Sequence, residues 1–157
     1  MELLNTLLTR KAIFNVSREH VFMFKIKEGE TLETNNSVIL DLDTFEAVTA
    51  EHYIDNAIHF GIAINILELK DGSRLVICRD GYKSLYNPSG DITEDDIGKP
   101  CYFDGKNTVS LNSSNAIKAG EIVYLDISDD KADIEDGTDR IVAVRVAPLE
   151  EGGIKIW

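Results

Sequence analysis

Residues 57–81, which read AIHFGIAINILELKDGSRLVICRDG, decide the fold class. Apolar residues alternate with other residues through the first half of this stretch, which is typical of a β-strand; they are Ile58, Phe60, Ile62, Ile64 and Ile66. Gly61 interrupts the alternation and predicts a β-bulge or a close backbone contact. Residues 70–73 form a hairpin turn signal, residues 74–79 read as the returning strand, and Asp80 and Gly81 predict a further turn. The stretch therefore predicts a long antiparallel hairpin.

Short β-type segments flank this hairpin on both sides. Beyond it, strands are expected at residues 21–27, 38–42, 45–48, 101–103, 108–111, 121–127, 140–146 and 154–157. From residue 20 onward, helix is expected only as single turns, one within residues 49–56 and one at residues 94–96, where Thr93 is the predicted cap and three acidic residues suit the helix dipole. This pattern predicts an all-β protein, a small β-barrel or sandwich of short strands and hairpins.

A weak internal repeat relates two parts of the chain. In the first, a glycine-led segment at residues 61–64 is followed by an Asp-Gly turn and a strand flanked by Arg74 and Arg79. In the second, a glycine-led segment at residues 120–123 precedes an Asp-Gly turn and a strand flanked by Arg140 and Arg145. Two hairpins that pack as related layers would explain the repeat, and so would independent use of common hairpin signals.

Charge divides the chain into a basic leader and an acidic body. The 157 residues carry 16 Lys and Arg against 28 Asp and Glu, a net charge of −12. Residues 1–27 hold five of the bases and two of the acids, so their net charge is +3 and that of the remainder is −15. The acidic total argues against nucleic acid and anionic lipid as partners, because both are bound through Lys and Arg. No run of apolar residues is long enough for a membrane helix.

The leader predicts a docking arm. Its leucines recur with helical spacing, so we expect residues 1–19 to form a short helical or extended arm and residues 20–157 to form the β-barrel-like domain. The arm would bury its apolar side chains either on its own domain or on a partner. The residues expected to dock on a capsid or a neighbouring subunit are Leu3, Leu4, Leu7, Leu8, Arg10, Lys11, Ile13 and Phe14.

Residue patterns for catalysis, metals and cofactors are weak in this sequence. No phosphate-binding, dinucleotide-binding or nucleophile-elbow motif occurs, so we expect no cofactor and no enzymatic activity. Cys78 and Cys101 have no nearby partner cysteine and read as small strand hydrophobes, which argues against a metal site. Residues 126–139 are rich in acids and read either as a solvated hairpin tip or as an adventitious calcium site.

Several segments resemble the capsid cement, or head decoration, proteins of tailed bacteriophages. Residues 60–64 (FGIAI) and 76–81 (VICRDG) are similar to the core of that family. Residues 91–102 (DITEDDIGKPCY) are the more specific part, and residues 104–111 (DGKNTVSL) and 118–123 (KAGEIV) resemble its later strands. The chain departs from the short members of the family in its leading 20 residues and its long acidic segment at 126–139.

The resemblance implies a structural protein on the outer surface of the virion head. Such a protein would cement neighbouring major capsid proteins, would be made in the bacterial host cytoplasm, and would act as a homotrimer or other homo-oligomer. The acidic body and the leucine-striped leader are compatible with this role, since many weak contacts on a symmetric shell add up to high avidity. The alternative is a small acidic β-barrel module that binds a peptide or glycan in a bacterial cell, which exposed tyrosines at Tyr82 and Tyr86 would favour.

Overall fold

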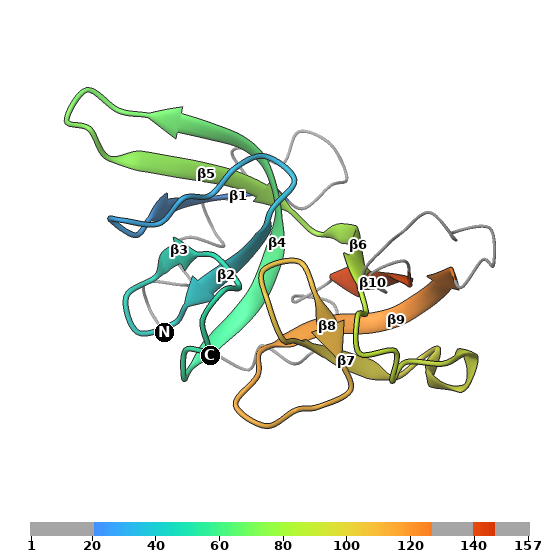
Figure 1. Cartoon of the computed structure of the whole chain (residues 1–157). Helices are drawn as coiled ribbons and strands as arrows, with labels where there is room; N and C mark the ends of the chain where they lie inside the picture. Colours follow the sequence, from blue (N-terminus) through green and yellow to red (C-terminus); the bar gives the residue numbers. More distant parts are fainter. Residues whose placement is uncertain (1–20, 127–139, 147–157) are drawn as a thin grey trace.

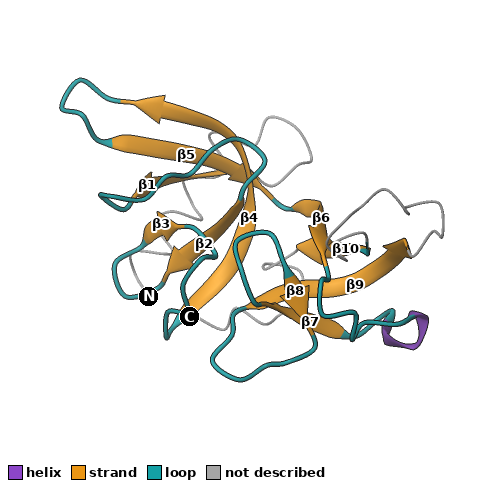
Figure 2. Ribbon diagram, viewed as in Figure 1, coloured by secondary structure: helices purple, strands orange, loops and turns teal. Residues whose placement is uncertain are grey.

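The computed structural model describes residues 21–126 and 140–146, and nearly all of its regular structure is β-strand (Figure 2). This confirms the predicted all-β class. The strands are β1 (Val21–Ile26), β2 (Ser37–Asp41), β3 (Glu46–Val48), β4 (Ala57–Glu68), β5 (Arg74–Arg79), β6 (Gly81–Tyr86), β7 (Pro100–Phe103), β8 (Val109–Ser110), β9 (Lys118–Asp126) and β10 (Ile141–Val146). A single 3-10 turn, η1 (Glu94–Asp96), precedes β7.

The first five strands close into a barrel, which we call the first unit (residues 21–79). Its strand order is β1-β3-β2-β4-β5, and β5 pairs with β1 to complete the circle. All neighbours are antiparallel except β1 and β3, which run parallel. Closure of this kind leaves no unpaired strand edge within the barrel.

The other five strands form a second sheet, which we call the second unit (residues 81–126 and 140–146). Its order is β6-β10-β9-β7-β8. A parallel bridge between Tyr86 and Thr108 brings the start of β8 back towards β6, so the sheet curls almost into a barrel. In Figure 1 the two units lie side by side, with β4 between β1, β3 and β5 of the first unit and the strands of the second.

The two units repeat one strand plan, with β1 to β5 corresponding in order to β6 to β10. In the first unit, Val38 pairs with Gly61 and Ile39 with His59, so the register shifts by one residue. In the second, Cys101 pairs with Gly120 and Tyr102 with Lys118, which is the same shift at the same place.

The hairpins that the sequence repeat singled out match in the same way. Ile62 pairs with Arg79 and Ala63 with Cys78, after which the register skips Ile64. In the second unit, Glu121 pairs with Arg145 and Ile122 with Val144, after which it skips Val123. The weak repeat therefore reflects two related units and not only common turn signals.

The loops before β2 and β7 share the repeat as well. Asn35 and Gly98 both adopt positive φ, at 70° and 94°. Asn35 donates its backbone N–H to the Ala63 carbonyl, and Gly98 donates to the Ile122 carbonyl. Corresponding positions therefore use the left-handed region that glycine and asparagine tolerate best.

Two polar contacts of the loops are also duplicated. The side chain of Arg74 donates to the Glu30 carbonyl, and that of Arg140 donates to the carbonyls of Gly90 and Ile92 at 2.8 and 2.7 Å. The first arginine of each hairpin thus holds the loop that leaves the first strand of its unit.

A carboxylate in each of these loops accepts a backbone hydrogen bond from the residues that follow the third strand of its unit. The Glu30 carboxylate accepts the backbone N–H of Thr49 at 3.3 Å, and the Asp91 carboxylate accepts that of Leu111 at 2.9 Å. These four residues occupy matching places in the two units.

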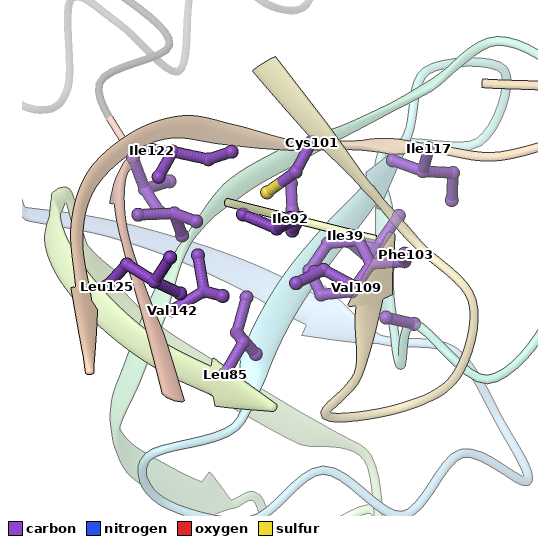
Figure 3. Close-up of a cluster of buried hydrophobic side chains, with 14 of the residues drawn as sticks. Ile39, Leu85, Ile92, Cys101, Phe103, Val109, Ile117, Ile122, Leu125 and Val142 are labelled. Atoms are coloured by element: carbon purple, nitrogen blue, oxygen red, sulfur yellow. The ribbon is translucent and has the colours of Figure 1, made fainter. Parts of the chain in front are cut away.

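Each unit has its own hydrophobic core. The core of the first unit lies inside the barrel, where the ring of Phe60 packs edge-on against Phe22 and Phe24 with centroids 4.8 and 4.9 Å apart. The second core includes Leu85, Ile92, Cys101, Phe103, Val109, Ile117, Ile122, Leu125 and Val142 (Figure 3).

The second core also joins the units. Ile39 and Val48, from β2 and β3 of the first unit, are buried among the side chains of the second. On β4, the His59 ring lies edge-on to Phe103 at 5.0 Å, and its Nδ1–H donates to the Ala119 carbonyl at 2.6 Å. These contacts fix the orientation of one unit against the other.

The structure corrects two sequence expectations. Residues 49–56 form turns and bends with no helical turn, since Ala50 is committed to the second core instead of a helix. Asp80 and Gly81 do not make a hairpin turn; the chain passes directly from β5 into β6 and so from the first unit into the second. Strand β6 itself was not predicted. The other strands expected between residues 21 and 146 are confirmed.

Candidate functional site

The outer surface of the first unit's barrel carries a group of aliphatic side chains, which we call the aliphatic face, with exposed Lys25, Asn65 and Arg79 in the same cross-strand rows. Residues of β1 and β5 alternate between the core and the outside, so Phe22 and Phe24 point inward and their neighbours point outward. The outward apolar side chains are partly or well exposed; they are Val21, Met23, Ile64, Leu67, Leu75 and Ile77.

The register shift in β4 contributes to this face. The predicted alternation would place Ile64 on the same face as Phe60, in the core. Because Ile64 is skipped in the pairing with β5, its side chain is instead 42% exposed, and Leu67 is 37% exposed. Exposed aliphatic side chains grouped on one surface are typical of a protein interaction site.

The second unit has a corresponding outer surface, which we call the tyrosine face. Three rows of residues cross β6, β10 and β9 in register: Tyr82–Arg145–Glu121, Ser84–Ala143–Tyr124 and Tyr86–Ile141–Asp126. Directly opposed residues of antiparallel strands share one face of a sheet. The alternate residues of these strands, such as Leu85, Val142 and Ile122, are buried in the core.

Tyr82 and Tyr124 of this face are the two most exposed tyrosines among the described residues. Tyr82 is 69% exposed, Tyr124 60% and Tyr86 44%. The repeat places Val21, Asn65 and Lys25 at the matching positions of the first unit. The fold therefore does not require aromatic residues there.

The residues predicted to dock, Leu3, Leu4, Leu7, Leu8, Arg10, Lys11, Ile13 and Phe14, lie outside the described part of the chain, as does the predicted arm boundary. The structure does show the segment of the body that follows the leader. It leads into Val21, which begins β1 and is itself a member of the aliphatic face.

The two cysteines of the body are buried. Cys78 and Cys101 are free cysteines within the two cores. Burial raises the pKa of both thiols, that of Cys101 to about 12. A thiol must ionise to act as a nucleophile or metal ligand, so these two behave as the small hydrophobes that the sequence predicted.

His59 is buried as well. Burial lowers its pKa to about 4, against the hydrogen bond to Ala119, which favours the charged form. Its Nδ1 carries the proton, because its partner is a carbonyl, and its Nε2 has no hydrogen-bond partner. The neutral ring is a link between the two units.

The acidic cluster before β7 is structural. The Asp96 carboxylate accepts the backbone N–H of Thr93 at 2.8 Å, which caps the 3-10 turn as predicted for this segment. That hydrogen bond lowers the pKa of Asp96, and the nearby Lys99 ammonium adds to the effect. The Asp96 carboxylate thus supports the turn that precedes β7.

Asp91 anchors the same region. Burial alone would raise its pKa, but hydrogen bonds from the Asn87 amide, the Leu111 backbone and the Ser89 hydroxyl lower it. The family-like segment at 91–102 therefore starts at a carboxylate that bonds to residues at the ends of β6 and β8.

Metal ligands do not gather in the described residues, where no group of three or more His, Cys, Asp or Glu side chains could hold an ion. Of the acidic segment 126–139, only Asp126 belongs to the described part. The predicted strand 154–157 also lies outside it.

The tyrosine face was only partly visible in the sequence. Tyr82, Ser84 and Tyr86 alternate with Lys83 and Leu85, and this period-two pattern could have indicated β6. Tyr124 could not be added to them from sequence, because its proximity depends on the order of strands in the sheet.

In residues 21–126 and 140–146, no helix has the length and apolar character that crossing a membrane requires. No family model matches the chain, and no curated protein or solved structure is significantly similar to it. The resemblance to capsid cement proteins stays a prediction from the segments quoted above.

Proposed function

We propose that this chain is a structural decoration protein of a bacteriophage head, which binds the outer surface of the capsid and cements neighbouring major capsid proteins. The observation that carries the proposal is the aliphatic face and its position directly after the leucine-striped leader. The leader precedes Val21 of the face in the chain, so we expect leader and face to dock on the same partner.

The aliphatic face suits a protein partner. Its side chains come from three adjacent strands of a closed barrel, so they are held in fixed positions before binding. Covering apolar surface is worth about 25 cal/mol per Å². Because these side chains are already held in place, binding costs less conformational entropy.

Charge supports the same arrangement. The leader carries Arg10 and Lys11 beside its leucines, while the body is strongly acidic and keeps free copies apart before assembly. On a symmetric head, each weak contact is repeated over many sites, and homotrimers or other homo-oligomers would strengthen binding further.

Burial of the nucleophilic groups supports a structural role over an enzymatic one. The thiols of Cys78 and Cys101 and the ring of His59 are committed to the cores. The aliphatic face and the tyrosine face are exposed, and exposed apolar and aromatic side chains serve binding.

Binding to capsids that lack the protein tests the proposal. Purified protein is mixed with expanded heads, and bound protein is measured by co-sedimentation together with the heat stability of the heads. We expect binding and a gain in head stability, both weakened by deletion of residues 1–16. Absence of both would overturn the proposal.

A pair of matched variants tests the aliphatic face. Ile64→Asp adds a charge to this face and should weaken head binding at least tenfold. Ile97→Asp makes the same change at an isoleucine that is 49% exposed on the second unit, outside this face, so it should bind almost as the parent does. Equal binding by the two variants would remove the face from the docking surface.

The exposed rings of Tyr82 and Tyr86 favour a second candidate function, that of a small acidic module for a peptide or glycan. The two candidates use different faces on different units. Ile64→Asp should affect only head binding, so the two functions can be tested separately.

A further inference from the structure

We propose that the tyrosine face binds a neutral oligosaccharide. This rests on the second candidate function given above and names its ligand class, and it leaves the capsid-docking surface on the first unit. The proposal is built on the shape of the face, on the exposed rings and on charge.

The face is small. It spans three adjacent strands and five residues along β6, which corresponds to about 10 Å by 14 Å of sheet. A stable protein–protein interface needs roughly 800 Å² from each partner, several times more than this face offers. A second copy of the chain is therefore too large a partner for it, and a short linear ligand fits.

The rings are arranged around a shallow floor. Tyr82 and Tyr86 lie two rows apart on β6, and Tyr124 lies on β9 in the row between them. The middle row holds Ser84 and Ala143 beside Tyr124, and the side chains of these two neighbours are short. Tyrosine combines an apolar ring with a polar hydroxyl, which suits a ligand that has both kinds of surface.

Sugars have this double character. The C–H faces of a pyranose ring pack on aromatic rings, while its hydroxyls need hydrogen-bond partners at the rim. Tyrosine hydroxyls and the Ser84 hydroxyl lie on the face itself, and Glu121, Arg145 and Asp126 occupy its row ends and centre strand. A neutral oligosaccharide would use both sets of groups.

The negative charge of the protein disfavours negatively charged ligands at this face. The protein carries a net charge of −12, and the nine positions of the face hold two acids against one base. Nucleic acids, acidic glycans and anionic lipids would be repelled. An uncharged ligand meets no such barrier.

Comparison of the two units indicates that the tyrosines serve binding and not folding. The same strand plan is built in the first unit with valine, asparagine and lysine at the three positions. Exposed rings that add nothing to the core are costly for solubility unless something binds them.

The test uses the full-length protein and an array of neutral hexasaccharides of glucose, galactose, mannose and N-acetylglucosamine, followed by calorimetric titration of those that bind. We expect at least one of them to bind, with affinity lowered at least tenfold in Tyr82→Ala and in Tyr124→Ala. Tyr53→Ala is the matched control, since Tyr53 is 49% exposed but lies outside the face and bonds to Asp55.

Three results would overturn the proposal: no binding to any hexasaccharide, equal binding by the face variants and the parent, or equal loss in Tyr53→Ala. Circular dichroism of each variant checks that it is folded. Head binding distinguishes this proposal from the function proposed above, because Tyr82→Ala should leave it unchanged; if it abolished head binding, the tyrosine face would belong to the docking surface instead.

Discussion

Gly61 lies so close to Arg79 that a Cβ atom on Gly61 would stand 2.6 Å from the Arg79 carbonyl oxygen. The second unit repeats the relationship, since a Cβ on Gly120 would meet the carbonyl oxygen of Arg145. In both hairpins the residue after the glycine pairs with that arginine. The glycines that lead the repeated segments are thus explained by a backbone approach that no side chain fits.

Gly61→Ala should therefore destabilise the protein by about 1–3 kcal/mol, because the clash is with backbone and cannot be relieved by a rotamer change. Urea unfolding measures the loss. Gly98→Ala is the control: its added Cβ meets nothing within 4 Å, so only the strain of its positive φ remains, about 1 kcal/mol. A smaller loss in Gly61→Ala than in the control would contradict the close approach.

Substitutions at Asn35 test whether the loops before β2 and β7 are equivalent in the two units. It occupies the place of Gly98 and holds a φ of 70°, so Asn35→Gly should leave stability nearly unchanged, whereas Asn35→Ala should cost about 1 kcal/mol. Thermal unfolding of the two variants gives the comparison. If the alanine variant proved the more stable, the matched loop geometry would be wrong.

His59 predicts loss of stability in mild acid. Its pKa of about 4 in the folded protein lies below the 6.5 of an unfolded chain, so the unfolded state takes up the proton first as pH falls. The neutral His59 ring makes its full contribution to the free energy of unfolding above pH 6.5 and loses it as the pH falls from 6.5 to 4. We therefore expect the free energy of unfolding to drop by about 2 kcal/mol from pH 7 to pH 5. Urea unfolding at the two pH values measures this.

The control for this prediction is His59→Gln, which keeps an amide donor near the Ala119 carbonyl but does not titrate. Its stability should fall less than that of the parent between pH 7 and pH 5. Identical pH profiles for His59→Gln and the parent would refute the assignment.

Asn87 replaces a backbone donor that Pro88 cannot supply. In the first unit, Lys27 donates its N–H to the Ala47 carbonyl; in the second, the fully buried Asn87 side chain donates to the matching Val109 carbonyl at 2.7 Å. Asn87→Leu should cost at least about 2 kcal/mol, since it leaves this carbonyl and the Ile92 N–H unpaired.

Chemical denaturation checks the Asn87 prediction, with Ser89→Ala as control. The Ser89 hydroxyl bonds to the same Asp91 carboxylate, but in an exposed position, so its loss should cost well under 1 kcal/mol. Comparable losses in the two variants would show that Asn87 is not the structural donor.

Local patterns were sufficient for most of the strands. Alternation and turn residues located β4 and β5 and the hairpin between them, because these signals act over a few neighbouring residues. The same reasoning identified the capped turn at Thr93. It failed at residues 49–56, where polar residues resembled a helical turn while Ala50 packs in the second core.

The faces were harder to anticipate. Ile64 reads as a core residue by alternation, and only the register shift against β5 turns it outward. The tyrosine face joins β6 and β9, which are not sequence neighbours and meet across β10. Such relationships depend on strand order and pairing, which lie beyond the reach of a short sequence window.

The sequence by itself determined the all-β class, the basic leader on an acidic body and the glycine–arginine repeat, since each depends on local pattern or on composition. Only the tertiary structure decided that the repeat is a pair of matching five-strand units with a shared core, and that one unit displays aliphatic and the other aromatic side chains. The physical reason is that backbone pairing sets which residues share a face, and pairing is settled by the whole sheet at once.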